Sequence, residues 1–290
     1  MLTCRLCGAC QSVAIRKGVR LAQEVEIRRC TSCNLVFLWP MPDEPMLSGY
    51  YADDYRRDYD EPSVSERFKA DMDEARSRVR RLLPMLTDQI QLLEIGAGSG
   101  AFLDAVRPYV SVADGVEPDR ASRKWIQGLG GHRVFSDLNE IGERAAKYDL
   151  IVSFHVLEHV PSPLRFLGQV RPILRSSATL VLEVPNVDDA LVGVYQIPAY
   201  LDFYYQKAHL FYFSAHTLSS ALGRAGYEAH IEGVQRYDLS NHIRWMLTGQ
   251  PGGQGYYGNT LGQAVNAAYA ESLIRSGHSD TLWATARIRG

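Results

Sequence analysis

The segment Leu92–Gly100 constrains this chain more than any other part of its sequence. A mainly apolar run ends in a turn that contains Gly96, Gly98 and Gly100, and a helix-forming segment, Ala101–Val106, follows at once. Glycine lets the backbone turn tightly and approach a ligand where a side chain would collide. The first N–H groups of the following helix have no partner inside the helix and are available to polar groups of that ligand. The pattern predicts a strand, a turn and a helix that bind a nucleotide cofactor.

Two kinds of cofactor fit the glycines. The series Gly96-x-Gly98-x-x-Ala101 satisfies the dinucleotide fingerprint, but such a match is weak on its own. Glu94 favours a different ligand, because a carboxylate two residues before the first glycine suits an ammonium group better than a pyrophosphate. Here the sequence resembles the class I S-adenosylmethionine (SAM) methyltransferases, whose first motif has this acidic-x-Gly-x-Gly-x-Gly form. An exposed carboxylate at a strand end is the simpler alternative for Glu94.

Further strands and helices alternate along the chain. Apolar runs predict strands at 110–116, 134–137, 148–154, 179–184 and 282–288, and capped helices begin after Ser162 and Ser214. Alternation of this kind predicts an α/β fold with a doubly wound parallel sheet, which binds ligands at the carboxyl ends of its strands. The resemblance implies a Rossmann-like methyltransferase sheet of seven strands.

Three residues at the ends of these strands are expected to contact SAM. Glu117 follows the second strand, where a carboxylate can accept hydrogen bonds from both ribose hydroxyls. The resemblance places Asp137 near the adenine amino group, and we expect Phe154, at the end of the fourth strand, beside the cofactor. With Glu94 and the three glycines, they complete the predicted cofactor site.

The likeness becomes closer after the fourth strand. The segment His155–Pro161 (His-Val-Leu-Glu-His-Val-Pro) resembles the Leu-Glu-His-Val segment of small-molecule methyltransferases related to the ubiquinone O-methyltransferases. Pro185-Asn186 matches the Pro-Asn after their fifth strand, and 209–218 resembles their His-x-x-x-Phe-Ser-x-x-Thr-Leu segment. The family's Lys-Pro-Gly-Gly turn before that strand is replaced by 175–178, Arg-Ser-Ser-Ala, which we expect to be a turn as well.

Methyl transfer from a sulfonium is an in-line displacement, and a hydroxyl acceptor also needs a general base. His209 and His159 are the preferred candidates, and a hydrogen-bonded structural role is the alternative for either. His155, Glu158 and His159 share one side of a helical turn by their spacing. Some relatives bind a divalent ion in this segment through carboxylates and a histidine, but His155 stands where a second carboxylate would help. Expected acceptor-binding residues are Asn186, Tyr204, Tyr205 and Tyr212.

The amino-terminal part contains two pairs of cysteines, Cys4-x-x-Cys7 and Cys30-x-x-Cys33, near the spacing of a zinc ribbon. The chain between the pairs is long enough for a hairpin, and a four-thiolate site of this kind is structural. A disulfide framework fits poorly, because no apolar signal peptide follows Met1, and we therefore expect a cytoplasmic protein. Cys10 is left over.

After the second cysteine pair come an apolar strand, Pro40-x-Pro42, and then Tyr50 and Tyr51, which we expect near the acceptor. This order resembles the zinc module of methyltransferases that modify nucleotide sugars and other bacterial metabolites. The predicted domains are a ribbon at 1–42, a linker and amphipathic helix at 43–88, and a SAM domain at 89–290. The helix, at 64–86, is expected to pack by its apolar face with its arginines in solvent; a lid over the cofactor is the alternative.

The 290 residues have a formal charge of −2 and are 46% hydrophobic. There is no general basic field for nucleic acid and no run of about 18 apolar residues to span a membrane. We expect a small-molecule acceptor, most of all a hydroxyl of a sugar or sugar nucleotide. The alternatives are a natural-product intermediate methylated at oxygen, nitrogen or carbon, and a non-catalytic SAM-binding or zinc-ribbon interaction protein. Intact glycines and Glu117 favour an enzyme.

Overall fold

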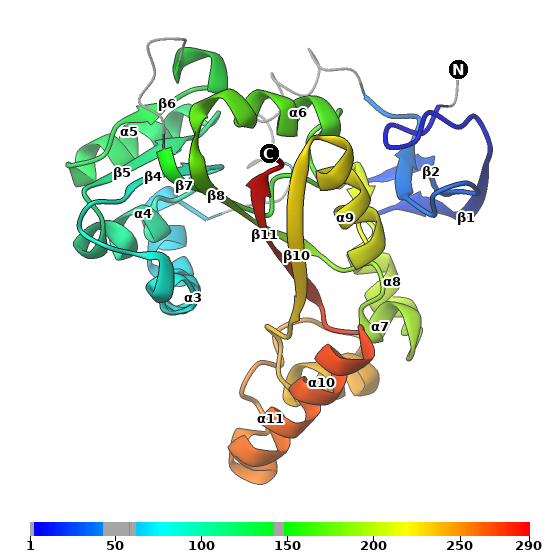
Figure 1. Cartoon of the computed structure of the whole chain (residues 1–290). Helices are drawn as coiled ribbons and strands as arrows, with labels where there is room; N and C mark the ends of the chain where they lie inside the picture. The colour runs from blue at the N-terminus through cyan, green and yellow to red at the C-terminus, as the bar shows by residue number, and fades with distance from the viewer. Residues whose placement is uncertain (1–2, 43–57, 59–61, 142–147) are drawn as a thin grey trace. The chain divides into compact units, whose positions relative to one another are not determined.

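The computed structural model describes residues 3–42, 58, 62–141 and 148–290 (Figure 1). The chain divides into two compact units. The first contains Met1–Met41, Leu157–Leu164 and Leu182–Thr285, and the second contains Pro42–Val156, Arg165–Val181 and Ala286–Gly290. Tyr50 and Tyr51 lie outside the described residues. The division at residues 42 and 88 stays a prediction.

The second unit is built around four parallel neighbouring strands. They are β4 (Gln91–Ile95), β5 (Val112–Val116), β6 (Val134–Phe135) and β7 (Tyr148–Phe154). β4 lies between β5 and β7, and Leu92 and Leu93 are fully buried. Strands covered on both faces are nearly continuously apolar, as the run in β7 shows.

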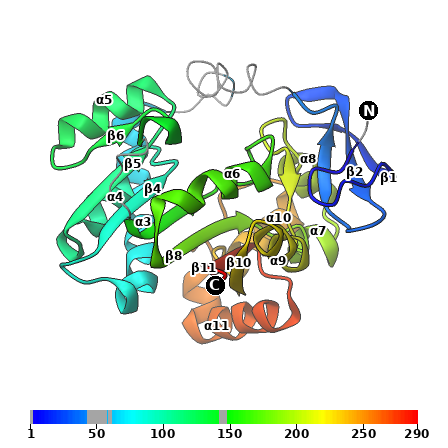
Figure 2. The same cartoon turned by 45° about the horizontal axis from the view of Figure 1, so that its top comes forward.

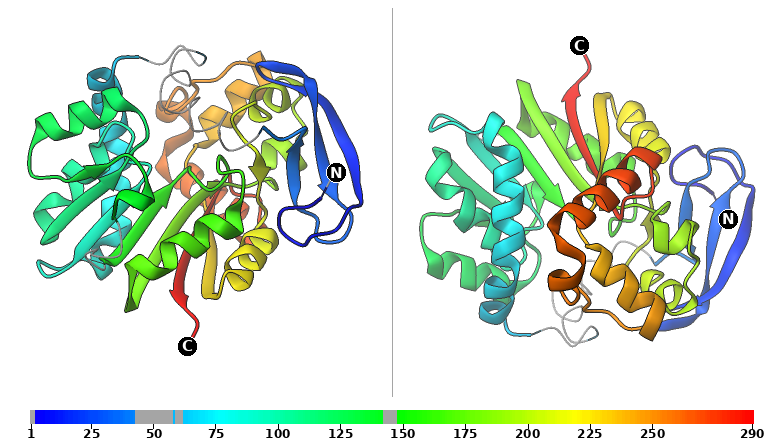
Figure 3. Two further views of the ribbon diagram at one scale, coloured as in Figure 1. Left: turned by 90° about the horizontal axis from the view of Figure 1, so that it is seen from above. Right: turned by 90° about the horizontal axis from the view of Figure 1, so that it is seen from below.

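Helices α3 (Val64–Leu82), α4 (Ala101–Val106) and α5 (Arg120–Leu129) belong to the same unit, and α3 packs against the other two (Figure 3). The predicted helix at 64–86 ends early, at Leu82, because Pro84 cannot continue an α-helix. A 3₁₀ turn, η2 (Leu83–Met85), follows. The shorter segments are η3 (Arg107–Tyr109), η4 (Leu138–Ile141), α6 (Pro163–Val170) and η5 (Arg171–Ile173).

The carboxyl-terminal part of the first unit contains α7 (Ala190–Gly193), α8 (Pro198–Tyr204), β9 (Phe211–Tyr212), α9 (Ala215–Arg224), β10 (Tyr227–Val234), α10 (Leu239–Thr248) and α11 (Gly258–Ser276). Ser214 caps α9 by accepting a hydrogen bond from the Thr217 amide at 3.2 Å. Helices α10 and α11 follow β10 and precede β11 in the sequence, and they pack against each other (Figure 3). Helix α11 is kinked at Gly262.

Two sheets are formed. The larger one has seven strands in the order β10-β11-β8-β7-β4-β5-β6, where β8 is Leu174–Pro185 and β11 is Thr281–Ile288. The predicted seven-stranded α/β sheet is therefore confirmed. The expected turn at 175–178 is wrong, because these residues lie inside β8, where Arg175 forms an ion pair with Asp149 of β7.

The smaller sheet has the order β1-β2-β3-β9, with β1 (Ser12–Val19), β2 (Ala22–Cys30) and β3 (Val36–Trp39) from the amino-terminal part. The predicted hairpin is the antiparallel pair β1 and β2 (Figure 2). β3 pairs with β2 on one side and with β9 on the other. Within the described segments, no helix combines the length and apolar character needed to cross a membrane.

Candidate functional site

The glycine turn between β4 and α4 leaves no room for side chains at two of its positions. Gly96, Gly98 and Gly100 all have positive φ, at 82°, 54° and 78°. A Cβ atom on Gly96 would lie 2.3 Å from Cγ2 of Val156, and one on Gly100 would lie 2.7 Å from Cγ1 of Ile126. The amides of Gly96 and Ala97 both donate to the Val116 carbonyl, which holds the turn against the end of β5. Tight packing and left-handed backbone together explain the glycines.

Glu117 lies against this turn. Its carboxylate accepts hydrogen bonds from the Gly98 amide at 2.7 Å and from the Asp119 amide at 2.8 Å. The side chain is buried, and burial raises its pKa to about 7 although the two amides act in the opposite direction. Glu117, the residue predicted to bind the ribose, is therefore fixed beside Gly98.

Glu94 is also buried, with 4% of its surface exposed. Its Oε2 atom has no hydrogen-bond partner among the described residues. Burial raises its pKa well above the usual value, and the nearby Arg78 opposes that shift. A buried carboxylate oxygen with unused acceptor capacity fits a ligand that brings a cation, such as the ammonium group of SAM.

Helix α3 contributes residues that the sequence analysis did not assign to the site. A Cβ on Gly98 would lie 3.2 Å from Nη2 of Arg67, and Asp71 accepts a hydrogen bond from Ser99 of the turn at 2.6 Å. The guanidinium of Arg78 lies 4.4 Å from the ring centroid of Phe154. These three polar residues share one helix face, at spacings of four and seven, and that spacing was the available signal.

The other predicted cofactor residues lie in the same unit. Phe154 is buried at the end of β7 and contacts Phe102 edge to face, with ring centroids 5.0 Å apart. Asp137 is exposed after β6, and its carboxylate accepts a hydrogen bond from the Asn139 amide at 2.7 Å. His155 follows β7 with a φ of 55°, a left-handed conformation that is unusual for a residue with a side chain.

The remaining catalytic candidates form a cluster in the first unit. Ligand atoms of Glu158, His159 and His209 lie within 4.8 Å of one another, and the two imidazole rings are 4.8 Å apart, edge to face. Nδ1 of His159 lies 2.9 Å from the Ala208 carbonyl and donates a hydrogen bond to it. His209 is hydrogen-bonded through Nε2 to the side-chain amide of Gln206 at 2.8 Å.

The predicted tyrosines lie beside this cluster. Tyr212 contacts Tyr204, Tyr205 and His209, with ring centroids 5.6, 4.9 and 5.8 Å away. All three tyrosines are buried, and Tyr204 donates to the Asn186 carbonyl at 2.9 Å. The Asn186 side chain donates to the carbonyls of Gly277 and Ser279, which ties it to the chain before β11. The tyrosines thus lie beside the histidines, whereas the side-chain amide of Asn186 is hydrogen-bonded to the protein backbone.

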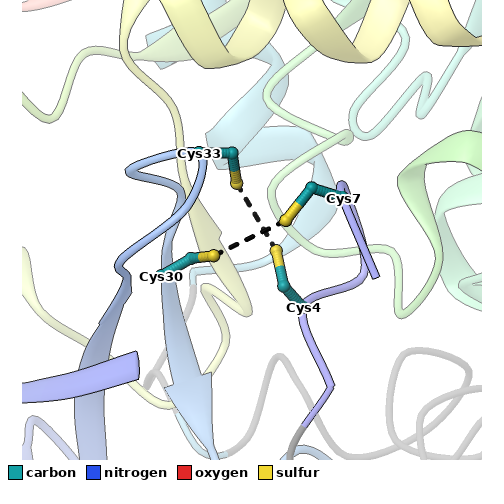
Figure 4. Close-up of side chains that lie close together, drawn as sticks. All are labelled: Cys4, Cys7, Cys30 and Cys33. Atoms are coloured by element: carbon teal, nitrogen blue, oxygen red, sulfur yellow. Dashed lines mark hydrogen bonds between the residues drawn. The ribbon is translucent and has the colours of Figure 1, made fainter. Parts of the chain in front are cut away.

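The four cysteines converge on one point (Figure 4). The Sγ atoms of Cys4 and Cys33, and those of Cys7 and Cys30, are 3.6 Å apart. A tetrahedral zinc site with Zn–S bonds of about 2.3 Å requires sulfur atoms about 3.8 Å apart, so the spacing fits zinc. Burial acts to raise the pKa of Cys30, but hydrogen bonds from the backbone N–H groups of Cys33 and Ser32 and contacts with the Cys7 and Cys33 thiols together lower it to about 7. Burial raises the pKa of Cys4 and of Cys33.

Both cysteine pairs are shaped in the same way. The residue after each second cysteine, Gly8 or Asn34, has positive φ and donates its amide to the first cysteine's carbonyl, at 2.9 and 3.0 Å. Glycine and asparagine are the residues that adopt this conformation most readily. The sequence after each pair therefore carries the signal for a metal-binding turn, and the cysteines are positioned for zinc.

Comparisons with known proteins agree with this geometry. One similar solved structure is the complex between the Haloferax volcanii Trm112 methyltransferase activator and the putative methyltransferase, with 14% identity and a TM-score of 0.55. The match covers 86% of this chain and 100% of that chain. A SAM-dependent methyltransferase from Archaeoglobus fulgidus has 20% identity and a TM-score of 0.53, with 77% and 96% covered. The plantazolicin methyltransferase BpumL in complex with S-adenosylhomocysteine (SAH) has 16% identity and a TM-score of 0.50, and the match covers 84% of this chain and 94% of that chain. At these identities the likeness shows the fold. Among curated proteins, none matches.

The family comparison is decisive. A family model described as "Methyltransferase domain" matches residues 66–231, more than half of the chain, from the start of α3 to β10. This range contains the glycine turn, Glu94, Glu117 and the histidine cluster. The chain belongs to this methyltransferase family and is a SAM-dependent methyltransferase.

Proposed function

We propose that the protein methylates a hydroxyl group of a sugar or sugar nucleotide, with the histidine pair His159 and His209 supplying the general base. The observation that carries this proposal is the pair itself: two imidazoles 4.8 Å apart, beside the buried Glu158. A hydroxyl is barely ionised at neutral pH and needs such a base, whereas an amine in its neutral form already carries the lone pair that attacks.

SAM, when bound, supplies an activated methyl group for displacement. In the proposed mechanism, Glu94 binds the ammonium group of the cofactor and Glu117 accepts hydrogen bonds from its ribose. The Ala208 carbonyl accepts a hydrogen bond from Nδ1 of His159, which fixes the orientation of the ring that we assign as the base.

The experiment is a screen of nucleoside diphosphate sugars with SAM that carries a labelled methyl group. Mass spectrometry of the products identifies the sugar that gains one methyl group, and fragmentation shows whether oxygen, nitrogen or carbon is modified. Transfer to carbon or nitrogen of a sugar would refute the hydroxyl proposal. No transfer to any sugar would favour the second candidate, a natural-product intermediate methylated at oxygen, nitrogen or carbon. The tyrosine-rich surroundings of His209 favour that candidate, since aromatic side chains stack on planar acceptors.

Single variants test the base. We expect His159→Ala or His209→Ala to lower kcat by about 10²- to 10⁴-fold, the usual contribution of a general base, with the Kd for SAM unchanged. His216→Ala is the matched control, because His216 is exposed on α9 of the same unit. If both single variants keep wild-type turnover, the pair is not the base.

Calorimetry with SAM tests the non-catalytic alternative. A scaffold protein without a working cofactor site would give no heat of binding.

A further inference from the structure

The two histidines depend on one short segment of chain. Residues 205–210 join α8 to β9 and contain Gln206, Ala208 and His209. These residues provide the Gln206 amide that hydrogen-bonds to His209 and the Ala208 carbonyl that fixes His159. The segment is neither helix nor extended strand, so its backbone N–H and C=O groups need partners elsewhere.

The amino-terminal ribbon supplies several of those partners. At the tip of the β1–β2 hairpin, the Arg20 amide donates to the Tyr205 carbonyl at 2.9 Å, and the Lys207 amide donates to the Arg20 carbonyl at 3.0 Å. These two bonds form a parallel bridge between Arg20 and Gln206. One end of the segment is therefore held by the hairpin tip.

The other end is held by β3. The Leu38 amide donates to the Leu210 carbonyl at 2.9 Å, and β9 then continues as the antiparallel neighbour of β3, with Val36 opposite Tyr212. Val36 and Tyr212 are each 1% exposed. The ribbon thus contacts the segment both before and after His209.

Side chains reinforce the contact. Arg16 forms an ion pair with Asp202, and the guanidinium of Arg20 lies 5.0 Å from the ring centroid of Phe203. Both partners lie in α8, immediately before the segment. Cation–π and ionic contacts at an exposed surface contribute little each, so the backbone bonds are the main restraint.

The cysteine site determines where this restraint lies. β2 ends at Cys30, and β3 begins three residues after Cys33. The Cys30 amide donates to the Leu35 carbonyl at 2.9 Å, which ties the second cysteine pair directly to the start of β3. Zinc on the four thiolates would fix both strands at this end, since metal binding and local folding are coupled.

We propose that the zinc ribbon is a positioning element for the methyl-acceptor side of the enzyme: it holds residues 205–210 and, through them, the imidazoles of His159 and His209. The catalytic part of this inference rests on the proposed function of the histidine pair. The positioning part rests on the hydrogen bonds alone.

The test uses the full-length, zinc-loaded protein and the variant Arg20→Pro, which removes the amide that donates to Tyr205. Leu21→Gly is the matched control: it changes the neighbouring residue of the same turn, where Leu21 is half exposed and has a φ of 70° that glycine adopts readily. Zinc content and SAH affinity, from calorimetry, verify that the metal site and the cofactor site remain intact.

Two readouts follow the segment without any acceptor. Amide hydrogen exchange at Lys207, Leu210 and Phe211 should become about tenfold faster in Arg20→Pro and unchanged in Leu21→Gly. In NMR spectra of protein with labelled histidine, the pH titration curves of His159 and His209 should move, while that of His216 stays in place. A role limited to stability would leave the native-state titration curves where they are.

Zinc removal by a chelator provides a second perturbation if Arg20→Pro fails to fold. It should accelerate exchange in the same segment and leave the Kd for SAH within about twofold. With an acceptor, both perturbations should lower kcat and alter the shape of its pH profile. Unchanged exchange at 205–211 together with unchanged histidine titrations would overturn the proposal. If the segment loosens as expected but His159→Ala and His209→Ala retain full turnover, the positioning stands and only the general-base assignment fails.

Discussion

Acidification should weaken cofactor binding through Glu117. This carboxylate is held by the amides of Gly98 and Asp119 and is buried, which places its pKa at about 7. Our assignment has the ribose hydroxyls of SAM donating to the charged carboxylate. A protonated carboxyl group accepts such bonds poorly, so each binding event below pH 7 requires loss of a proton.

The magnitude follows from that pKa of about 7. Between pH 7.5 and pH 5.5 the charged fraction of Glu117 falls about 25-fold, which corresponds to about 1.9 kcal/mol of binding free energy. The stability of the ligand-free protein should change in the opposite direction. Since the folded pKa lies above the unfolded value, the stabilisation from Glu117 is present at low pH and is lost as pH rises through 7.

The assay is calorimetric titration with SAH at pH 5.5, 6.5 and 7.5 for wild type and Glu117→Gln. Glu117→Gln should bind SAH more weakly than wild type at pH 7.5. Its affinity for SAH should also fall less on acidification, because the glutamine amide does not titrate. Glu228→Gln, which changes an exposed carboxylate on β10, is the control and should match wild type. Equal pH dependence in wild type and Glu117→Gln would refute the assignment of Glu117 to the ribose.

Two further substitutions test the glycine turn and the cysteine site. Gly100→Ala should lower stability in thermal unfolding clearly more than Gly277→Ala does. Both positions have left-handed backbone, which costs a side chain about 1 to 2 kcal/mol, but only at Gly100 would the new Cβ also lie 2.7 Å from Ile126. Equal losses of stability would contradict the packing argument. Cys30→Ser should lower the zinc content measured by atomic absorption and speed amide hydrogen exchange across β1 to β3. Cys10→Ser, which changes an exposed thiol, is the control and should alter neither quantity. Full zinc content in Cys30→Ser would exclude the four-thiolate site.

The parts of the fold that were predicted well are those with a local signal. The strand and turn at Leu92–Gly100 follow from residue type alone, because glycine and apolar residues restrict the backbone directly. β7 begins and ends where its apolar run does, at Tyr148 and Phe154. The two cysteine pairs carry their own turn residues, so their convergence could be expected before any tertiary contact was known.

Other features depend on distant partners and have little local signal. The polar residues Arg175 to Ser177 favour a turn by composition, but they lie in β8, where Arg175 forms an ion pair with Asp149 of the neighbouring strand β7. The polar face of α3 had the composition of a solvated surface, and only the fold shows that Arg67 and Asp71 face the glycine turn. Periodicity identifies a polar face and does not tell what lies opposite it.

The pairing of β3 with β9 has a consequence for biosynthesis. Val36 to Trp39 leave the ribosome long before Phe211 and Tyr212 exist, and at about 5–20 residues per second this delay lasts roughly 10 to 35 s. Throughout that interval the nascent chain carries an apolar strand with one unsatisfied edge, the kind of surface on which chains aggregate. Newly made copies should therefore be most vulnerable while they are still being translated, and a chaperone that shields this edge during elongation would raise the yield of folded enzyme.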